Sequence, residues 1–190
     1  MRRCLLTIIL VCLAAPWPVS ARPEVEVKRS HGIFSVHVTA PVVVDAQTAW
    51  QVLTDYNHLA DFVPGMKSSR VISAAGEPLR IEQKGETRFL FFSREFHVVL
   101  AIEELPPEQI KFHAVGGDMK RMQGEWRVRA DGAAGVRLEY EAEIEPGFWV
   151  PIFLGTALMR HDVSDNIEGV AGEMLKRHAA VHGKTAASPP

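Results

Sequence analysis

A run of alternating apolar and polar residues, followed by one long helical segment, constrains the fold of this chain more than any other feature. Six strands with no helix between them are predicted from Lys67 to Ile144, over residues 68–74, 79–91, 93–104, 109–115, 123–130 and 136–144. The apolar residues that alternate with charged ones in the last two strands are Trp126, Val128, Val136, Leu138, Tyr140, Ala142 and Ile144. This period of two predicts an antiparallel sheet with one apolar face and one solvated face.

The residues after Pro146-Gly147 show helical spacing instead. We predict one helix over residues 151–178, whose apolar stripe comprises Ile152, Thr156, Met159, Val163, Ile167, Val170 and Met174. Its charged residues, among them Arg160, Asp162 and Asp165, are expected on the solvated side. Since a sheet must bury its apolar face against another element, this helix is expected to cover it. Residues 179–190 are predicted to be a disordered tail.

The first part of the folded chain combines an extended segment with two short helical ones. Residues 24–40 alternate in the manner of a strand, and Asp45 can cap a helix that ends near Leu53. The stretch LTDYNHLADFVPGM, residues 53–66, is rich in apolar residues but interrupted by turn-forming ones. It has too little surface for a core of its own. We therefore expect it to form an apolar plug or rim between the sheet and the long helix.

The N-terminus has the order of a secretory signal peptide. Arg2 and Arg3 precede the apolar run LLTIILVCLAA, and small residues lead up to Ala21. The run is shorter than the about 20 residues of a membrane-spanning helix. We therefore predict residues 1–21 to be a signal peptide that is cleaved after Ala21, and the protein to be periplasmic or secreted. Residues 22–178 then form one domain.

Cleavage changes the composition of the mature chain. Both cysteines, Cys4 and Cys12, lie in the removed segment, so we expect no disulfide and no thiolate metal site. The formal charge of −2 becomes −4, because the segment contains two arginines and no acidic residue. A mildly acidic protein has no general electrostatic attraction for nucleic acid, so none is expected as a partner.

The sequence contains no motif typical of an enzyme. It has no Gly-x-Ser-x-Gly elbow, no phosphate-binding glycine loop and no dinucleotide fingerprint. The acidic residues Glu139, Glu141 and Glu143 alternate onto the solvated face of their strand. We expect none of the eight histidines to form a His-x₃-His ligand pair. The sequence therefore predicts no catalytic residue, no metal and no cofactor.

Several stretches together carry a family resemblance. They are AWQVLTDYNHLADFVPGMKSSRVI, IEQKGETRFLFFS, VVLAIEEL, IKFHAVGGDMKRMQGEWRV, LEYEAEIEPGFWVPIFL and the long last helix. In this order they resemble the SRPBCC helix-grip superfamily of START lipid-transfer domains and polyketide cyclases/dehydrases, and within it the coenzyme Q-binding START-domain family. The resemblance implies an α+β fold, in which a curved antiparallel seven-stranded sheet wraps around a long C-terminal helix, with two short helices after the first strand.

The same resemblance implies a tapered cavity between sheet and long helix that binds an apolar molecule: a lipid, a fatty acyl chain or an isoprenoid quinone. The candidate lining residues are Phe62, Phe89, Phe91, Trp126, Val128, Leu138, Tyr140, Phe153, Met159, Val163 and Ile167. Tyr140 and Arg160 are the candidate polar groups. We expect a monomer that contacts a membrane transiently to exchange its ligand. Two alternatives stay open: a polyketide cyclase- or dehydratase-like enzyme using the same cavity, and a cell-envelope interaction module with a filled core.

Overall fold

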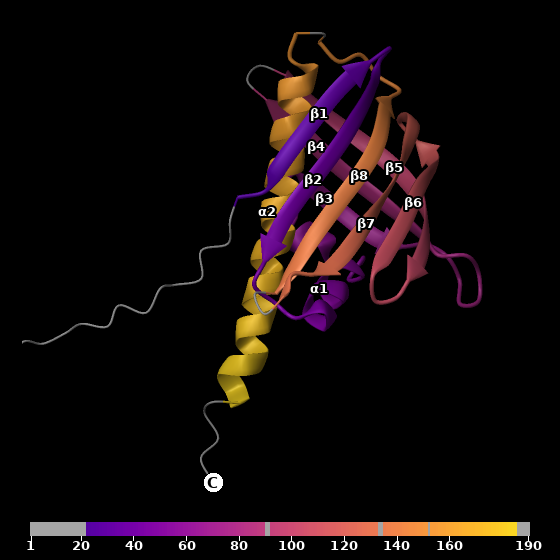
Figure 1. Cartoon of the computed structure of the whole chain (residues 1–190). Coiled ribbons are helices and arrows are strands. Elements are labelled where there is room, and N and C mark those ends of the chain that lie inside the picture. Colours follow the sequence, from indigo (N-terminus) through magenta and orange to yellow (C-terminus); the bar gives the residue numbers. More distant parts are fainter. Residues whose placement is uncertain (1–21, 90–91, 133–134, 152, 186–190) are drawn as a thin grey trace, which may run out of the picture.

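The computed structural model describes residues 22–89, 92–132, 135–151 and 153–185 (Figure 1). The strands are β1 (Glu24–Ser30), β2 (Ile33–Val42), β3 (Met66–Val71), β4 (Arg80–Phe89), β5 (Phe92–Leu105), β6 (Gln109–Gly117), β7 (Met119–Ala130) and β8 (Val136–Pro146). The helices are α1 (Ala46–Leu53), the short 3-10 helix η1 (Leu59–Asp61) and α2 (Gly155–Thr185). The predicted α+β helix-grip architecture is thereby confirmed.

The described strands form one antiparallel sheet in the order β1-β2-β8-β7-β6-β5-β4-β3, with eight strands rather than the predicted seven. The difference arises because residues 24–40 are a hairpin, in which Ser30 pairs with Ile33. The two turn residues, His31 and Gly32, have φ angles of 51° and 87°. Positive φ at both central residues is typical of the tight turns that match the twist of paired strands. Ser30-His31-Gly32 therefore reverses the chain instead of interrupting a single strand.

Helix α2 lies along one side of the curved sheet and continues past its edge (Figure 1). Its inner side buries Leu158, Val163, Ile167, Val170 and Met174, and Met174 is 0% exposed. Most of this row belongs to the predicted apolar stripe, so the expected covering of the sheet by the helix is confirmed. None of the described helices, α2 included, is long and apolar enough to cross a membrane.

The bounds of α2 differ from the predicted 151–178 at both ends. Phe153 and Leu154 form a turn just before Gly155, and the backbone N–H groups of Leu154 and Gly155 donate to the Pro151 carbonyl. At the other end the helix runs on to Thr185, so the predicted disordered tail is helical up to that residue. Residues 186–190 and the predicted signal peptide lie outside the described part of the chain.

The longer helix corrects one expectation about the histidines. His178 and His182 are four residues apart, and both lie within α2. Their rings are 4.1 Å apart between centroids, on the same face of the helix. The expectation that no two histidines form a His-x₃-His pair is therefore wrong.

The strand register confirms the two predicted faces of the sheet. Trp126 of β7 lies opposite Tyr140 of β8, and the next pair along is Arg127 with Glu139. The rings of Trp126 and Tyr140 are 4.7 Å apart between centroids. Both rings border the space beneath α2, whereas Arg127 and Glu139 belong to the polar face. The alternation in the sequence thus predicts which side chains enter the core.

The stretch 53–66 closes one end of the layer between the sheet and α2. Its backbone approaches α2 so closely that a Cβ added at Gly169 would lie 2.3 Å from the carbonyl oxygen of Phe62. On the same side of the molecule, Arg177 Nη2 of α2 donates to Asp55 Oδ2 at 2.8 Å. The stretch thus has the position expected of a rim, and it is attached directly to the long helix.

We predict opposite effects for two alanine substitutions in α2. Gly172→Ala should raise the free energy of unfolding by up to about 1 kcal/mol, since alanine favours a helix and nothing lies within 4 Å of the added Cβ. Gly169→Ala should lower it by about 1–3 kcal/mol, because the added Cβ would overlap the Phe62 carbonyl. Chemical denaturation measures both changes. Equal effects at the two positions would contradict the close contact between stretch 53–66 and α2.

Candidate ligand-binding site

An apolar cavity of about 170 Å³ lies between the sheet, the stretch 53–66 and α2. The sheet contributes inward-facing residues of several strands, such as Ile81 of β4, Leu100 of β5 and Ile110 of β6. The middle of α2 contributes Val163 and Ile167. The period of two in the strands and the period of 3.6 in the helix therefore direct apolar side chains into the same space. The sequence did not decide which alternate residues of the strands in 79–104 face inward. In the structure, Ile81 and Leu100 are among those that do.

One wall of the cavity comes from the stretch 53–66. The lining residues of this wall are Leu53, Tyr56, Leu59, Val63 and Met66. Phe62, the residue predicted from this stretch, packs elsewhere: the guanidinium of Arg177 lies 5.8 Å from its ring centroid. The signal that was missed is the spacing, because the five lining residues follow one another at steps of three and four and Phe62 lies outside that row.

Four of the predicted lining residues border the cavity, namely Trp126, Tyr140, Val163 and Ile167. Val128 and Leu138 are 4% and 1% exposed and belong to the packed core, away from this lining. Met159 is half-buried and packs against that core. The structure thus brings part of the predicted set together, while contact of these residues with a ligand stays a prediction.

Two predicted residues have the wrong position. Phe153 is 77% exposed, because α2 begins after it and the residue is not part of the helical stripe. Arg160 is exposed on α2, so it is not a polar group of the cavity. The side chain of Phe89 and the whole of Phe91 lie outside the described residues.

Polar side chains at the cavity are few and include Gln83, Tyr140 and Asn166. The hydroxyl of Tyr140 has no hydrogen bond to a described residue, and it is not sealed off from the cavity. Burial raises the pKa of Tyr140, so the phenol stays a neutral hydrogen-bond donor. The hydroxyl of Tyr56 is already engaged, because it donates to Glu104 Oε1 at 2.8 Å. Tyr140 is therefore the hydroxyl that a ligand oxygen can accept from.

The volume of the cavity limits what it can hold. At about 170 Å³ it is close to the roughly 150 Å³ of an engineered protein cavity that binds benzene. Sites that enclose a drug-sized ligand measure about 300–1,000 Å³. The inner cavity therefore accommodates about one six-membered ring, and a longer molecule must extend out of it.

A second, more polar hollow of about 360 Å³ adjoins the cavity. Val63, Met66 and Asn166 border both spaces, so these side chains separate the cavity from the outer hollow. We call this boundary the mouth. It lies between β4, α2 and the end of stretch 53–66.

A half-buried acid stands beside the mouth. Asp162 of α2 accepts a hydrogen bond from the hydroxyl of Thr87 on β4. Burial raises the pKa of Asp162 to about 6, although this hydrogen bond acts in the opposite direction. The expectation that Asp162 is solvated is thus wrong, and the residue joins the helix to the sheet at the mouth.

A larger hollow, of about 760 Å³, lies on the opposite, polar face of the sheet. Charged side chains line much of it, and several are paired. Lys28 Nζ lies 2.7 Å from Glu26 Oε1, and His37 Nδ1 lies 3.3 Å from Glu141 Oε1. An apolar ligand would have to displace water from these charges, so the smaller inner cavity is the better site for it.

Residues 42–171 match the model of a family described as polyketide cyclase / dehydrase and lipid transport. The chain belongs to this family. The predicted resemblance to the helix-grip superfamily is confirmed by this match and by the folds of solved structures. Among curated proteins, none matches the sequence of this chain.

Three solved structures illustrate the shared fold. A START superfamily protein from Mycobacterium smegmatis has a TM-score of 0.62 and 15% identity, over 76% of this chain and 97% of its own. A STAR-related lipid transfer protein from Xanthomonas axonopodis has a TM-score of 0.61 and 16% identity, over 79% of this chain and 98% of its own. The Zhui aromatase/cyclase from Streptomyces has a TM-score of 0.60 and 14% identity, over 76% of this chain and 95% of its own. At such identities the likeness shows the fold alone.

The name of the polyketide cyclase / dehydrase and lipid transport family covers both catalysis and transport. The side chains that line the cavity bear on which of the two this chain is equipped for. The described lining of the inner cavity includes no carboxylate, imidazole or amine. The titratable side chains in this lining are Tyr56 and Tyr140, and the raised pKa of each keeps its phenol neutral. Asp162 and His161 border only the outer hollow. The described lining of the inner cavity thus offers a bound molecule apolar contact and neutral hydrogen bonds.

We predict that Asp162→Asn stabilises the protein at pH 8 and not at pH 4. The pKa of Asp162 is about 6 in the folded state against the ordinary 3.8, so the folded state holds its proton more tightly. The protonated Asp162 side chain therefore contributes favourably to the free energy of unfolding below about pH 4, and this contribution is lost as the pH rises through about 6. The asparagine should add about 1–2 kcal/mol to the free energy of unfolding at pH 8, a value reduced for solvent screening.

Denaturant titration of both proteins at the two pH values measures the effect of Asp162→Asn. Asp165→Asn, a nearby substitution on α2, is the matched control and should change stability little at either pH. An equal effect of Asp162→Asn at pH 4 and pH 8 would contradict the raised pKa.

Proposed function

We propose that this protein is an exported single-domain carrier that binds a hydrophobic small molecule in the cavity between the sheet and α2. The observation that carries the proposal is the lining, in which apolar side chains surround a free tyrosine hydroxyl and two side-chain amides. Such a lining gains its binding energy from apolar burial, at about 25 cal/mol per Å² of surface removed from water. The few polar groups then orient the ligand.

The ligand class follows from volume and polarity together. The inner cavity of about 170 Å³ holds one ring, and the Tyr140 hydroxyl can donate to an oxygen on that ring. An isoprenoid quinone meets both conditions, with its head group inside and its chain leaving through the mouth. The hydrocarbon chain of a fatty acid or of another lipid fills the apolar volume but leaves the hydroxyl without a partner. We therefore favour the quinone among the three classes.

Exposed aromatic residues support transient contact with a membrane during ligand exchange. Trp149 and Phe153, on the segment between β8 and α2, are 74% and 77% exposed. On the same segment the ring of Phe148 lies beneath Arg94, with 5.1 Å between the guanidinium carbon and the ring centroid. Exposed tryptophan and phenylalanine beside a cation suit the boundary between lipid and water. We propose a monomer that docks through this segment.

The cavity also bears on the two alternative functions. A cyclase- or dehydratase-like enzyme would need acid–base groups at the reacting atoms, and in the described lining of the inner cavity only the phenols of Tyr56 and Tyr140 could take that role. A cell-envelope interaction module with a filled core would leave no free volume beside Val163 and Ile167. The cavity and its lining therefore favour the carrier over both.

We predict that enlarging a cavity residue impairs binding more than folding. Val163→Phe puts a ring into the space that the ligand occupies, so affinity should fall at least about tenfold while the free energy of unfolding changes by less than about 1 kcal/mol. Val128→Phe is the matched control, because Val128 is 4% exposed in the packed core, and overpacking there should cost about 1–3 kcal/mol.

The test of Val163→Phe uses fluorescence titration with a short-chain quinone and with an apolar naphthylamine dye, together with denaturant unfolding of each protein. Wild-type protein that binds neither probe, combined with a Val163→Phe variant that unfolds as easily as Val128→Phe, would overturn the carrier proposal. It would leave the interaction module as the explanation.

We predict export with removal of residues 1–21. The support is the order of two arginines, an apolar run and small residues before Ala21. Protein purified from its host cells should have the mass of a chain that begins at Arg22, and it should fractionate with the cell envelope or the medium. Cytoplasmic protein that retains Met1 would contradict this prediction without affecting the cavity.

A further inference from the structure

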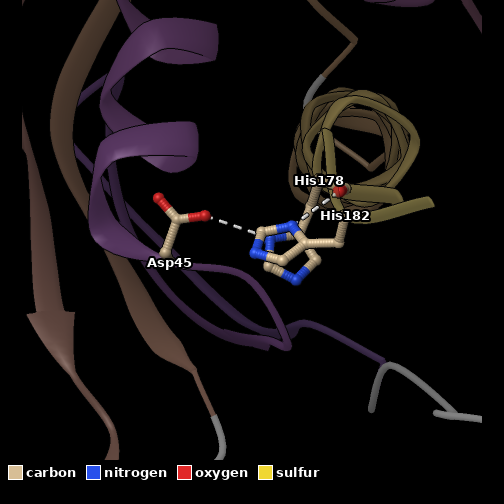
Figure 2. Close-up of side chains that lie close together, drawn as sticks. All are labelled: Asp45, His178 and His182. Atoms are coloured by element: carbon tan, nitrogen blue, oxygen red, sulfur yellow. Dashed lines mark hydrogen bonds and ion pairs between the residues drawn. The ribbon is translucent and has the colours of Figure 1, made fainter. Parts of the chain in front are cut away.

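Three metal-ligating side chains gather outside the cavity, where the end of α2 passes the start of α1. Figure 2 shows the carboxylate of Asp45, beside α1, facing the imidazole rings of His178 and His182 on α2. Each of the three residues offers one ligand atom, and these atoms all lie within 4.8 Å of one another. Asp45 Oδ2 is 3.0 Å from His178 Nδ1 although 133 residues separate them in the sequence.

We propose that Asp45, His178 and His182 bind a divalent transition-metal ion of the zinc class. Two imidazoles and one carboxylate are a ligand set that Zn²⁺ accepts, with the fourth position left to water. Ca²⁺ and Mg²⁺ prefer sets made of oxygen atoms, so the two histidines disfavour them. This site is separate from the proposed carrier function and would exist with or without a cavity ligand.

The hydrogen bonds around the cluster prepare its atoms for a metal. His182 Nδ1 lies 3.0 Å from the backbone carbonyl oxygen of His178, so it donates its proton there. The other ring nitrogen, Nε2, then keeps its lone pair for the ion, and such a bond to a carbonyl is the usual support of a metal-binding histidine. The imidazole of His182 is thus held in a tautomer that can bind.

The carboxylate of Asp45 is held in place. Its Oδ1 accepts from the backbone N–H of Thr48 at 2.7 Å, and its Oδ2 accepts from the Thr48 hydroxyl at 2.7 Å. The two bonds from Thr48 fix the orientation of the carboxylate toward the two histidines. Each carboxylate oxygen has about two lone-pair sites, so Oδ2 can keep the Thr48 bond and bind an ion in place of the His178 N–H.

The nearby guanidinium of Arg177 does not compete for the Asp45 carboxylate. Arg177 Nη2 lies 2.8 Å from Asp55 Oδ2, and Arg177 Nε lies 2.8 Å from Glu173 Oε1. Its positive charge is therefore balanced by two other acids, and Asp45 is left to face the two imidazoles.

Only a small movement is needed to close the site. Bonds of about 2.0–2.2 Å in a tetrahedron place ligand atoms about 3.3–3.6 Å apart. The cluster, with all ligand atoms within 4.8 Å, must therefore contract by at most about 1.5 Å. Asp45 and His182 are exposed, so changes of side-chain rotamer suffice. Binding would fasten the last turns of α2 to the start of α1.

The proposal is tested by calorimetric titration of ZnCl₂ into the full chain, prepared without a histidine tag. One Zn²⁺ should bind per chain, and His182→Ala should lower the affinity at least about tenfold. Asp45→Asn should do the same while keeping the cap of α1, because asparagine is also a good N-cap residue. His161→Ala, which removes a histidine elsewhere on α2, is the matched control and should bind as wild type does.

Thermal unfolding gives a second readout. Zinc should raise the unfolding temperature of wild type and of His161→Ala, since an ion that binds only the folded state stabilises it. It should leave that of His182→Ala nearly unchanged. Absence of zinc binding to wild type, or binding that His182→Ala and Asp45→Asn do not weaken, would overturn the proposal. Neither result depends on the cavity or its ligand.

Discussion

The burial of one sheet face by a single helix is the constraint on which this structure depends. Eight antiparallel strands present more apolar surface than one helix can cover, even when the sheet curves around it. The stretch 53–66 covers part of the remainder and closes one end of the layer. The space that neither element fills is the cavity. A binding site thus arises here from an incomplete match between two surfaces rather than from a dedicated loop.

Features set by local periodicity could be predicted from the sequence, whereas features set by chain reversal could not. The inward faces of Trp126 and Tyr140 follow from alternation alone. The eighth strand depends on positive φ at His31, a conformation that a non-glycine residue adopts only in a suitable turn. The continuation of α2 past residue 178 follows from Ala179 and Ala180, good helix formers that the assumption of a flexible tail overlooked.

The candidate site was predicted less completely than the fold, for a related reason. Period two identifies an inward face but not which inward residues border empty space, so Val128 and Leu138 could not be distinguished from Tyr140 in advance. That distinction depends on where α2 and the stretch 53–66 leave volume unfilled. The placement of Phe153 failed because it rested on the predicted start of the helix. The proposed metal site joins Asp45 to the distant histidine pair of α2, and only the folded chain brings the acid to that pair.

The close approach at Gly169 has a consequence for how the cavity can open. Backbone meets backbone there, because a Cβ at Gly169 would lie 2.3 Å from the Phe62 carbonyl and 2.8 Å from the Pro64 ring. No side chain can rearrange between the two segments to let them slide. If the proposed carrier exchanges its ligand, the rim and α2 are therefore expected to stay together while they separate from the sheet. Such an opening would break the hydrogen bond between Thr87 of β4 and Asp162 of α2.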